Sequence, residues 1–276
     1  FISKKKFIRN NAIANTLDLM KNRGPDYNSS YTQIVDDKNI SLLHSRLKII
    51  DIHSSRSNQP YRYKNFILIF NGEIYNFIEL RNKLKKIFKF DTSSDTEVLL
   101  KSYIAYGKKC VDHLEGMWSF AIWDIKKKSL FLSRDSFGEK PLFFYYSKDG
   151  FFFGSEIKYI KSLCEKNFIL NKTQVKKNLF LGYKSLNKTT DTFYDKIFSL
   201  ESGTNLTLDL KLNFKKEKYW QPKIKINKKM NLTDAVDGVR SLLLNSLKIR
   251  MRSDVPLAFC LSGGIDSGLL ASIAKK

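Results

Sequence analysis

The sequence predicts an α+β protein in which β-sheets pack on each other with helices outside, followed by the start of an α/β domain. Up to residue 204, short β-rich apolar runs follow one another closely and alternate with a few helical patterns. After residue 230 the pattern changes to a long amphipathic helix, an apolar run and a glycine-containing loop. With 276 residues, 42% of them apolar, the chain can bury a large core, and its length favours more than one domain.

The first half begins with a helical pattern at residues 12–21 that ends at the turn-forming sequence Arg-Gly-Pro-Asp of residues 23–26. Further helices are predicted at residues 77–86 and 95–106, the second opened by a capping box of Ser94 and Glu97. Several of the predicted strands are apolar on both faces, as in sandwiched sheets. The strands are expected at residues 31–35, 41–43, 66–70, 118–123, 130–132, 142–146 and 151–153.

The second half begins with a weakly patterned, Lys-rich stretch at residues 205–229, which we expect to link a first domain, 1–204, to a second, 230–276. Apolar residues recur mostly at intervals of three and four through residues 232–251, which predicts an amphipathic helix. A buried strand, a tight loop and the first turns of another helix are then expected, at residues 255–261, 262–267 and 268–274.

The chain is strongly basic, with 49 Lys and Arg against 27 Asp and Glu and a formal net charge of +22. Such an excess is typical of proteins that bind nucleic acid, anionic membranes or acidic ligands. Here the lysines are spread over the whole length, with only short runs such as residues 4–6 and 126–128, and many Asn and Ile accompany them. We therefore expect a general lysine bias, with no nucleic-acid or membrane partner.

The three cysteines form no Cys-x-x-Cys pair and have no metal-ligand spacing, which argues against a disulfide framework or a zinc site. Cys110, Cys164 and Cys260 are each expected to be small buried apolar residues. No apolar run approaches the roughly 18 residues needed to span a bilayer, and residues 1–11 lack the pattern of a secretory signal. We expect a cytoplasmic protein.

Residues 262–267 read Ser-Gly-Gly-Ile-Asp-Ser and are suited to holding phosphate. A glycine pair at a helix N-terminus offers inward-pointing N–H groups without side chains in the way, although an ordinary strand-to-helix turn is the alternative. Asp266 could cap the helix or approach the phosphates through Mg²⁺. We predict that ATP binds at Leu261, Ser262, Gly263, Gly264, Asp266 and Ser267.

This loop resembles the pyrophosphate loop of the ATP pyrophosphatases, which adenylate a carboxyl or carbonyl oxygen and release pyrophosphate. No Gly-Lys-Ser/Thr follows it, so a P-loop is not indicated. The superfamily includes asparagine synthetases, arginine and guanine-nucleotide synthetases and several tRNA-modifying enzymes. The loop alone does not choose among them.

Four motifs in the first half resemble the glutaminase domain of glutamine-hydrolysing asparagine synthetases, a class II glutamine amidotransferase family. They are Arg-Gly-Pro-Asp at 23–26, His-Ser-Arg-Leu at 44–47, Asn-Gly-Glu-Ile-Tyr-Asn at 71–76 and Ser-Asp-Thr-Glu at 94–97. Residues 134–142 and Gly-Ser-Glu at 154–156 match the family as well. The resemblance implies an αββα N-terminal-nucleophile hydrolase domain followed by the start of an α/β ATP-pyrophosphatase (PP-loop) domain.

Hydrolysis of a glutamine amide requires a hold on the α-carboxylate, a hold on the α-ammonium, and donors for the oxyanion. Arg46 offers a planar fork for a carboxylate. Glu73 and Asp95 could face an ammonium, and Asn71 with the N–H of Gly72 resembles an oxyanion hole. The resemblance implies the same roles at these positions, so we expect the five residues to form a glutamine pocket.

Several of these residues also have a purely structural interpretation. Asn71-Gly72 is a strong hairpin signal, and Arg46 alone would be a surface arginine. Glu97 is expected to cap a helix, a role that Asp95 could share. Residues 134–142 are expected to be mainly architectural, and three histidines are expected to be structural: His44, His53 and His113.

One feature departs from the family, whose nucleophile is an N-terminal cysteine with its own α-amino group as general base. The chain begins at Phe1, so we expect a Cys-Gly start to lie a few residues upstream. The second domain stops at Lys276, soon after Ser267, and the acceptor site is expected beyond it. By itself, this chain is therefore expected neither to hydrolyse glutamine nor to make asparagine.

The resemblance implies a ligase that converts ATP, aspartate and glutamine to asparagine, glutamate, AMP and pyrophosphate, through released ammonia and β-aspartyl-AMP. A homodimer is left open. Three alternatives also stay open: an amidotransferase for another carboxylate such as a sugar acid or peptide, a β-lactam-synthetase-like enzyme with an inactive glutaminase domain, and an RNA-modifying ATP pyrophosphatase. The presence of Arg46, Glu73 and Asp95 counts against the second.

Overall fold

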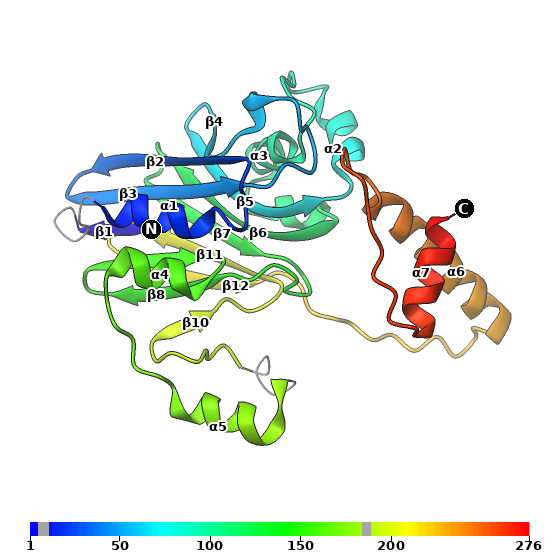
Figure 1. Ribbon diagram of the computed structural model, residues 1–276. Helices are drawn as coiled ribbons and strands as arrows, with labels where there is room; N and C mark the ends of the chain where they lie inside the picture. The colour runs from blue at the N-terminus through cyan, green and yellow to red at the C-terminus, as the bar shows by residue number, and fades with distance from the viewer. Residues whose placement is uncertain (5–10, 184–188, 276) are drawn as a thin grey trace.

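The computed structural model describes residues 1–4, 11–183 and 189–275, and its centre is two antiparallel sheets stacked face to face (Figure 1). The first sheet has the order β10-β8-β9-β1-β3-β2, formed by Ile197–Ser199, Phe143–Ser147, Gly150–Gly154, Ile2–Lys4, Lys38–Arg46 and Tyr27–Val35. The second has the order β12-β11-β7-β6-β5-β4, formed by Phe214–Lys218, Thr204–Asp209, Ser129–Arg134, Gly116–Asp124, Phe66–Ile74 and Tyr61–Tyr63.

Helices cover both outer faces of this sandwich. α1 (Ala12–Met20) and α4 (Ile157–Cys164) pack on the first sheet, and α3 (Asp95–Tyr106), with α2 (Phe77–Leu84) beside it, packs on the second. This order of layers is the expected αββα architecture. The described residues also form η1 (Ser55–Ser57), η2 (Gly107–His113), α5 (Lys172–Leu181), α6 (Leu232–Arg250) and α7 (Ile265–Ala274).

The period-two alternation of the strands explains why their apolar residues face both ways. On the second sheet, Ile67 and Trp123 face the first sheet, and Leu68 and Phe120 lie beneath α3. On the first sheet, Leu42 faces inward and its neighbour Leu43 packs toward α1 and α4. The expectation of sandwiched strands is therefore confirmed.

The predicted linker is wrong at its start. Residues 205–218 form the β11–β12 hairpin, which extends the second sheet beside β7. Leu206 and Leu208 reach the core between the sheets, whereas β12 is an exposed, Lys-rich edge strand. Charged residues protect sheet edges from further pairing, and their density concealed this strand in the sequence. The extended connection to α6 begins only after Trp220 (Figure 1).

The expected strand at residues 255–261 is also wrong, because this segment is irregular and largely exposed. A strand needs a hydrogen-bonded neighbour, and no other described segment pairs with it. Consequently Cys260 is exposed, contrary to expectation, although Cys110 and Cys164 are buried and all three thiols are free. α6 follows its predicted bounds closely, whereas α7 begins three residues earlier than expected, at Ile265.

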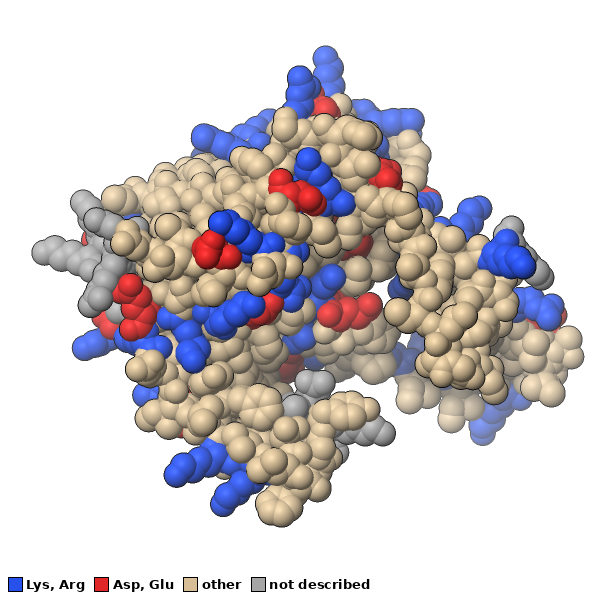
Figure 2. Space-filling model, in the orientation of Figure 1, with Lys and Arg blue, Asp and Glu red and all other residues tan. Residues whose placement is uncertain are grey.

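Surface charge is dispersed on the face of the molecule that Figure 2 draws. Figure 2 shows Lys and Arg in separate groups over the visible face, with acidic side chains among them. Of the basic run at residues 4–6, only Lys4 falls within the described residues, where it lies near Asp149. Within the described ranges, no helix is long and apolar enough to cross a membrane.

Candidate active site

The candidate site lies at one end of the sandwich, where the inward-facing residues change from apolar to polar. On β3 the series runs Ile40, Leu42, His44, Arg46, and on β5 it runs Ile67, Ile69, Asn71, Glu73. These polar ends, together with Gly72 and Asp95, line a cavity of about 260 Å³. Thus all five residues expected to bind glutamine line one cavity, although they come from three separate motifs.

Asn71 and Gly72 lie within β5 and do not form a hairpin turn, so the hairpin alternative is wrong. Asn71 Nδ2 donates to Ser155 Oγ at 3.0 Å, which orients the amide and leaves its second N–H without a partner among the described residues. The N–H groups of Phe70 and Ile74 bond to Gln59 and Asp95, on the side of β5 away from β6. By strand alternation the Gly72 N–H points to this same side, beyond the end of β4.

Two glycines permit the close backbone contacts that this geometry needs. Gly72 has φ +151°, and a Cβ there would lie 2.0 Å from the Met117 carbonyl oxygen. Gly24 packs against the end of β3, where a Cβ would lie 2.2 Å from the Ser45 carbonyl oxygen. Asp26 also stabilises the chain just after β3, because its carboxylate accepts the Lys48 N–H at 2.7 Å. The Arg-Gly-Pro-Asp motif therefore supports the strand that carries Arg46.

Glu73 and Asp95 form an acidic pair in the cavity, in which Asp95 is buried and Glu73 is partly buried. Burial, reinforced by the Asp95 charge, raises the pKa of Glu73 to about 9, and Glu73 Oε2 has no hydrogen-bond partner among the described residues. Burial raises the pKa of Asp95 to about 6, although the Ile74 N–H donates to its Oδ2 at 3.0 Å. Lys140, at the cavity wall, partly offsets the shift at Glu73. An ammonium group would relieve the repulsion between the two carboxylates.

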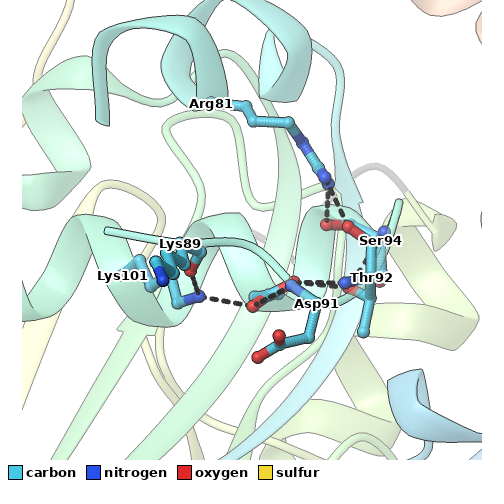
Figure 3. Close-up of polar contacts among 7 residues, drawn as sticks. Arg81, Lys89, Asp91, Thr92, Ser94 and Lys101 are labelled. Carbon is cyan, nitrogen blue, oxygen red and sulfur yellow. Dashed lines mark hydrogen bonds and ion pairs between the residues drawn. The ribbon is translucent and has the colours of Figure 1, made fainter. Parts of the chain in front are cut away.

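The position of Asp95 depends on the loop before α3, drawn in Figure 3. Ser94 Oγ caps the helix by accepting the Thr96 N–H at 3.0 Å, as predicted. Glu97 does not complete the capping box: its carboxylate instead accepts the N–H groups of Asp91 and Thr92. Glu97 therefore orders the loop before α3. Its carboxylate could have accepted either the Ser94 N–H, as in a capping box, or the loop N–H groups, and the fold places the loop groups within reach.

The charge of Glu97 is balanced inside the protein. Lys101 Nζ lies 2.5 Å from Glu97 Oε1, and both side chains are fully buried. Lys101 also lies 4.4 Å from the centre of the Phe90 ring and donates to the Lys89 carbonyl. From α2, Arg81 donates to the carbonyl oxygens of Thr92 and Ser94 (Figure 3). These contacts hold the loop at Lys89 on one end and at Thr92 and Ser94 on the other, directly before Asp95 begins α3.

Arg46 is buried and has a different arrangement from the one expected. Its Nη1 donates to Ser54 O and Asn58 Oδ1, and its Nη2 donates to Ile50 O and Asp51 O. All four Nη–H groups are therefore committed to the loop at the mouth of the cavity, and the open fork expected for a carboxylate is not present. The surface interpretation is equally wrong, since Arg46 is only 5% exposed, and this burial lowers the pKa of its guanidinium from the usual value.

Two pocket residues were not assigned a role in ligand binding from the sequence. Ser155 orients Asn71, and its place in the Gly-Ser-Glu motif was the available signal. His44 joins the two sheets through its Nε2, 3.1 Å from Phe70 O, and its Nδ1 is buried without a described partner. Burial lowers the pKa of His44 to about 4, so the imidazole is neutral at physiological pH.

The loop at residues 134–142 is architectural, as expected. The Asp135 carboxylate accepts backbone N–H groups from Trp118 and Lys140. Arg134 donates to the carbonyl oxygens of Gly138, Lys140 and Leu200. The loop thereby ties β6, the cavity wall at Lys140 and the segment before β11 together.

The proposed phosphate loop lies apart from this cavity, at the N-terminus of α7. Gly263 has φ +80°, and a Cβ there would meet nothing within 4 Å. Ser262 Oγ and Ser267 Oγ lie 3.1 Å apart and close the loop across its base. This open turn at a helix N-terminus fits a phosphate group. For Mg²⁺ the described residues offer Asp266 but no cluster of three or more His, Cys, Asp or Glu.

Comparison with known proteins agrees with both parts of the chain. Residues 2–220 match the family described as glutamine amidotransferase domain, and residues 238–276 match the one described as asparagine synthase. A Methanocaldococcus jannaschii protein assigned as glutamine-hydrolysing asparagine synthetase 2 is 36% identical, over 93% of this chain and 52% of its own. Glutamine-hydrolysing asparagine synthetase 3 of Bacillus subtilis is 35% identical, over 93% of this chain and 41% of its own.

The chain thus spans about half the length, or less, of these relatives. Among solved structures, glutamine phosphoribosylpyrophosphate amidotransferase from B. subtilis is 20% identical with a TM-score of 0.48, over 68% of this chain and 36% of that one. The family match covers both sheets and the five residues expected to bind glutamine. This chain belongs to the glutamine amidotransferase domain family.

Proposed function

We propose that this chain carries the glutamine pocket and the first part of the ATP site of an enzyme that makes asparagine from aspartate, ATP and glutamine. The observation that carries the proposal is the convergence of Asn71, Gly72, Glu73 and Asp95 in one cavity at the polar end of the sandwich. The names of the relatives support asparagine as the product.

Within this pocket, the α-ammonium of glutamine would lie between Glu73 and Asp95. Because burial raises the pKa of Glu73 to about 9, ammonium binding would expel a proton from this carboxyl. The amide oxygen would face Asn71 Nδ2 and the Gly72 N–H, which stabilise negative charge as the carbonyl is attacked. Arg46 would act indirectly, by holding the mouth loop at Ile50 and Asp51.

A nucleophile would reach the pocket along an existing strand path. Phe1 pairs with Ser41, and β1 lies between β3 and β9. An extended chain before Phe1 would continue this register, so the fifth residue upstream would lie opposite Arg46, at about 3.4 Å per residue. The facing ends of β3 and β9 line the cavity. A cysteine at that point would meet the amide carbonyl, and its α-amino group would accept the thiol proton.

At the second site, ATP would supply an adenylate that activates the acceptor carboxylate. The N–H groups of Gly263 and Gly264 and the hydroxyls of Ser262 and Ser267 would hold its phosphates, and Asp266 would approach Mg²⁺ from the first turn of α7.

The oxyanion assignment is tested with a chain that carries a Cys-Gly start five residues before Phe1. Asn71→Ala should lower the rate of glutamate release by about 10² to 10³, as expected for the loss of one oxyanion donor. Asn213→Ala, in the exposed β11–β12 turn, is the matched control. An unchanged rate in Asn71→Ala would refute the assignment.

The acceptor is tested by supplying ATP and glutamine with aspartate, sugar acids or peptides to a protein that extends beyond Lys276. Aspartate-dependent formation of asparagine and AMP is expected. If AMP forms with a sugar acid or a peptide but not with aspartate, the asparagine assignment is wrong, whereas the assignment as an amidotransferase stands. Salt-sensitive RNA binding together with RNA-dependent AMP release would instead support an RNA-modifying enzyme.

A further inference from the structure

The segment that leads from α6 into the phosphate loop touches the glutamine pocket at two points. Asp254 accepts the Asp51 N–H at 2.7 Å, and its own N–H donates to the Ile49 carbonyl oxygen at 2.9 Å. Arg252 forms two contacts of 2.6 Å with the Glu79 carboxylate and a third of 2.6 Å with the Tyr75 carbonyl oxygen. We refer to Arg252 and Asp254 as the clasp.

On one side the clasp holds the mouth loop. Ile49 and Ile50 line the cavity, and Asp51 follows them directly. From inside, Arg46 donates to the carbonyl oxygens of Ile50 and Asp51, and from outside Asp254 bonds to the same short loop. The loop is therefore fixed between a side chain of the sandwich and a side chain of the second domain.

On the other side the clasp holds the end of β5. Tyr75 lies two residues after Glu73 and directly follows Ile74, whose N–H binds Asp95. The Arg250 guanidinium also lies 5.0 Å from the centre of the Tyr75 ring. The Arg252 pair holds the pKa of Glu79 below its usual value, so Glu79 stays charged at physiological pH. Any displacement of Arg252 would therefore act on the acidic pair through one strand end.

We propose that Arg252 and Asp254 are positioning residues for glutamine, so that docking of the segment before the phosphate loop completes the glutamine pocket. The inference rests on the proposed function. Because binding linkage is reciprocal, glutamine in the pocket should in turn stabilise the docked position of this segment. The pocket and the phosphate loop are thereby joined through one short piece of chain.

The test is calorimetric titration of L-glutamine into the chain of residues 1–276 and its variants. Asp254→Asn and Arg252→Gln should each raise the dissociation constant about fivefold, and the double variant at least about tenfold, comparable to losing one charge-assisted hydrogen bond. Arg240→Gln and Asp237→Asn are matched controls, since this exposed pair lies on α6 at 3.7 Å. The controls should bind glutamine like the original chain.

Two further measurements separate positioning from general stability. The single variant Arg252→Glu should lose affinity for glutamine. The double variant Glu79→Arg/Arg252→Glu, which exchanges the two charges, should recover much of this affinity. Glutamine should also slow amide hydrogen exchange at Asp51 and at residues 250–254 in the original chain, and should do so less in Asp254→Asn.

The outcomes distinguish the two proposals. If the original chain binds glutamine and the clasp variants bind it equally well, the positioning role is wrong and the pocket stands. If clasp variants lose affinity only as their melting temperature falls, and the charge exchange restores nothing, the role is likewise wrong. If the original chain binds no glutamine, the proposed function fails and this inference fails with it.

Discussion

The sandwich of residues 1–218 and the segment of residues 232–275 hold their residues in different ways. Trp123 and Leu132 in the sandwich are at most 1% exposed, whereas Leu242 on α6 is 72% exposed and Ile265 on α7 is 89% exposed. The cavity lined by Asn71, Glu73 and Asp95 is accordingly positioned by packed strands and buried hydrogen bonds. The proposed phosphate loop is shaped by its own local hydrogen bonds, because little packs against it. Equivalent substitutions in the two regions should therefore differ in effect.

The largest difference is expected between two glycines with positive φ. Gly72→Ala would place a Cβ 2.0 Å from Met117 O, and the cost should exceed about 4 kcal/mol of unfolding free energy, enough to prevent folding. In Gly263→Ala the new Cβ would meet no atom within 4 Å. Only the left-handed backbone conformation should then lower the unfolding free energy, by about 1–2 kcal/mol. Circular dichroism and denaturant melts compare the variants. Equal losses of unfolding free energy in Gly72→Ala and Gly263→Ala would contradict the expected difference between the two regions.

Breaking the buried ion pair should have the next largest effect. Lys101→Met would leave the Glu97 carboxylate buried without its cation, which should cost about 3–5 kcal/mol and loosen the loop before Asp95. Arg240→Gln removes the exposed pair with Asp237 on α6 and should cost less than about 1 kcal/mol. Urea unfolding measures both. A loss below 1 kcal/mol in Lys101→Met would show that the pair is dispensable.

Core truncation should come third. Leu132→Ala removes a side chain packed between the sheets and should cost about 3 kcal/mol, from lost burial and the cavity left behind. Leu242→Ala, on the exposed face of α6, should change stability by no more than about 0.5 kcal/mol. Thermal unfolding of the pair tests this. A comparable loss in Leu242→Ala would mean that α6 is packed in solution.

The smallest changes in stability are expected when one acidic side chain in each region is neutralised, and these changes should have opposite signs. Since the pKa of Glu73 is about 9 in the folded protein and 4.5 ordinarily, its carboxyl lowers stability progressively as pH rises through that interval. Glu73→Gln should therefore raise the melting temperature by about 2–4 °C at pH 8 and by less at pH 5. Asp266→Asn, in the first turn of α7, should lower stability by about 0.3–1 kcal/mol. A destabilised Glu73→Gln at pH 8 would refute the raised pKa.

The difference between the regions also explains which sequence predictions were correct. Helices α1, α3 and α6 were predicted closely because their apolar spacing, and for α3 its Ser94 cap, are local properties of the chain. The strand at 255–261 was not, since a strand depends on a neighbour that the local pattern does not contain. The opposite error occurred at β12, where lysines that protect an edge looked like a linker.

By itself, the sequence determined that sheets pack on each other with helices outside, because apolar alternation is a property of the chain alone. The family resemblance of its motifs added the αββα order and the residues that line the cavity. Only the tertiary structure decided how those residues are used. It committed the Nη–H groups of Arg46 to the mouth loop, and it turned Glu97 from the expected cap to the loop before α3. Each of these side chains could satisfy its charge in more than one way, and the choice depends on which backbone groups the fold leaves within hydrogen-bonding distance.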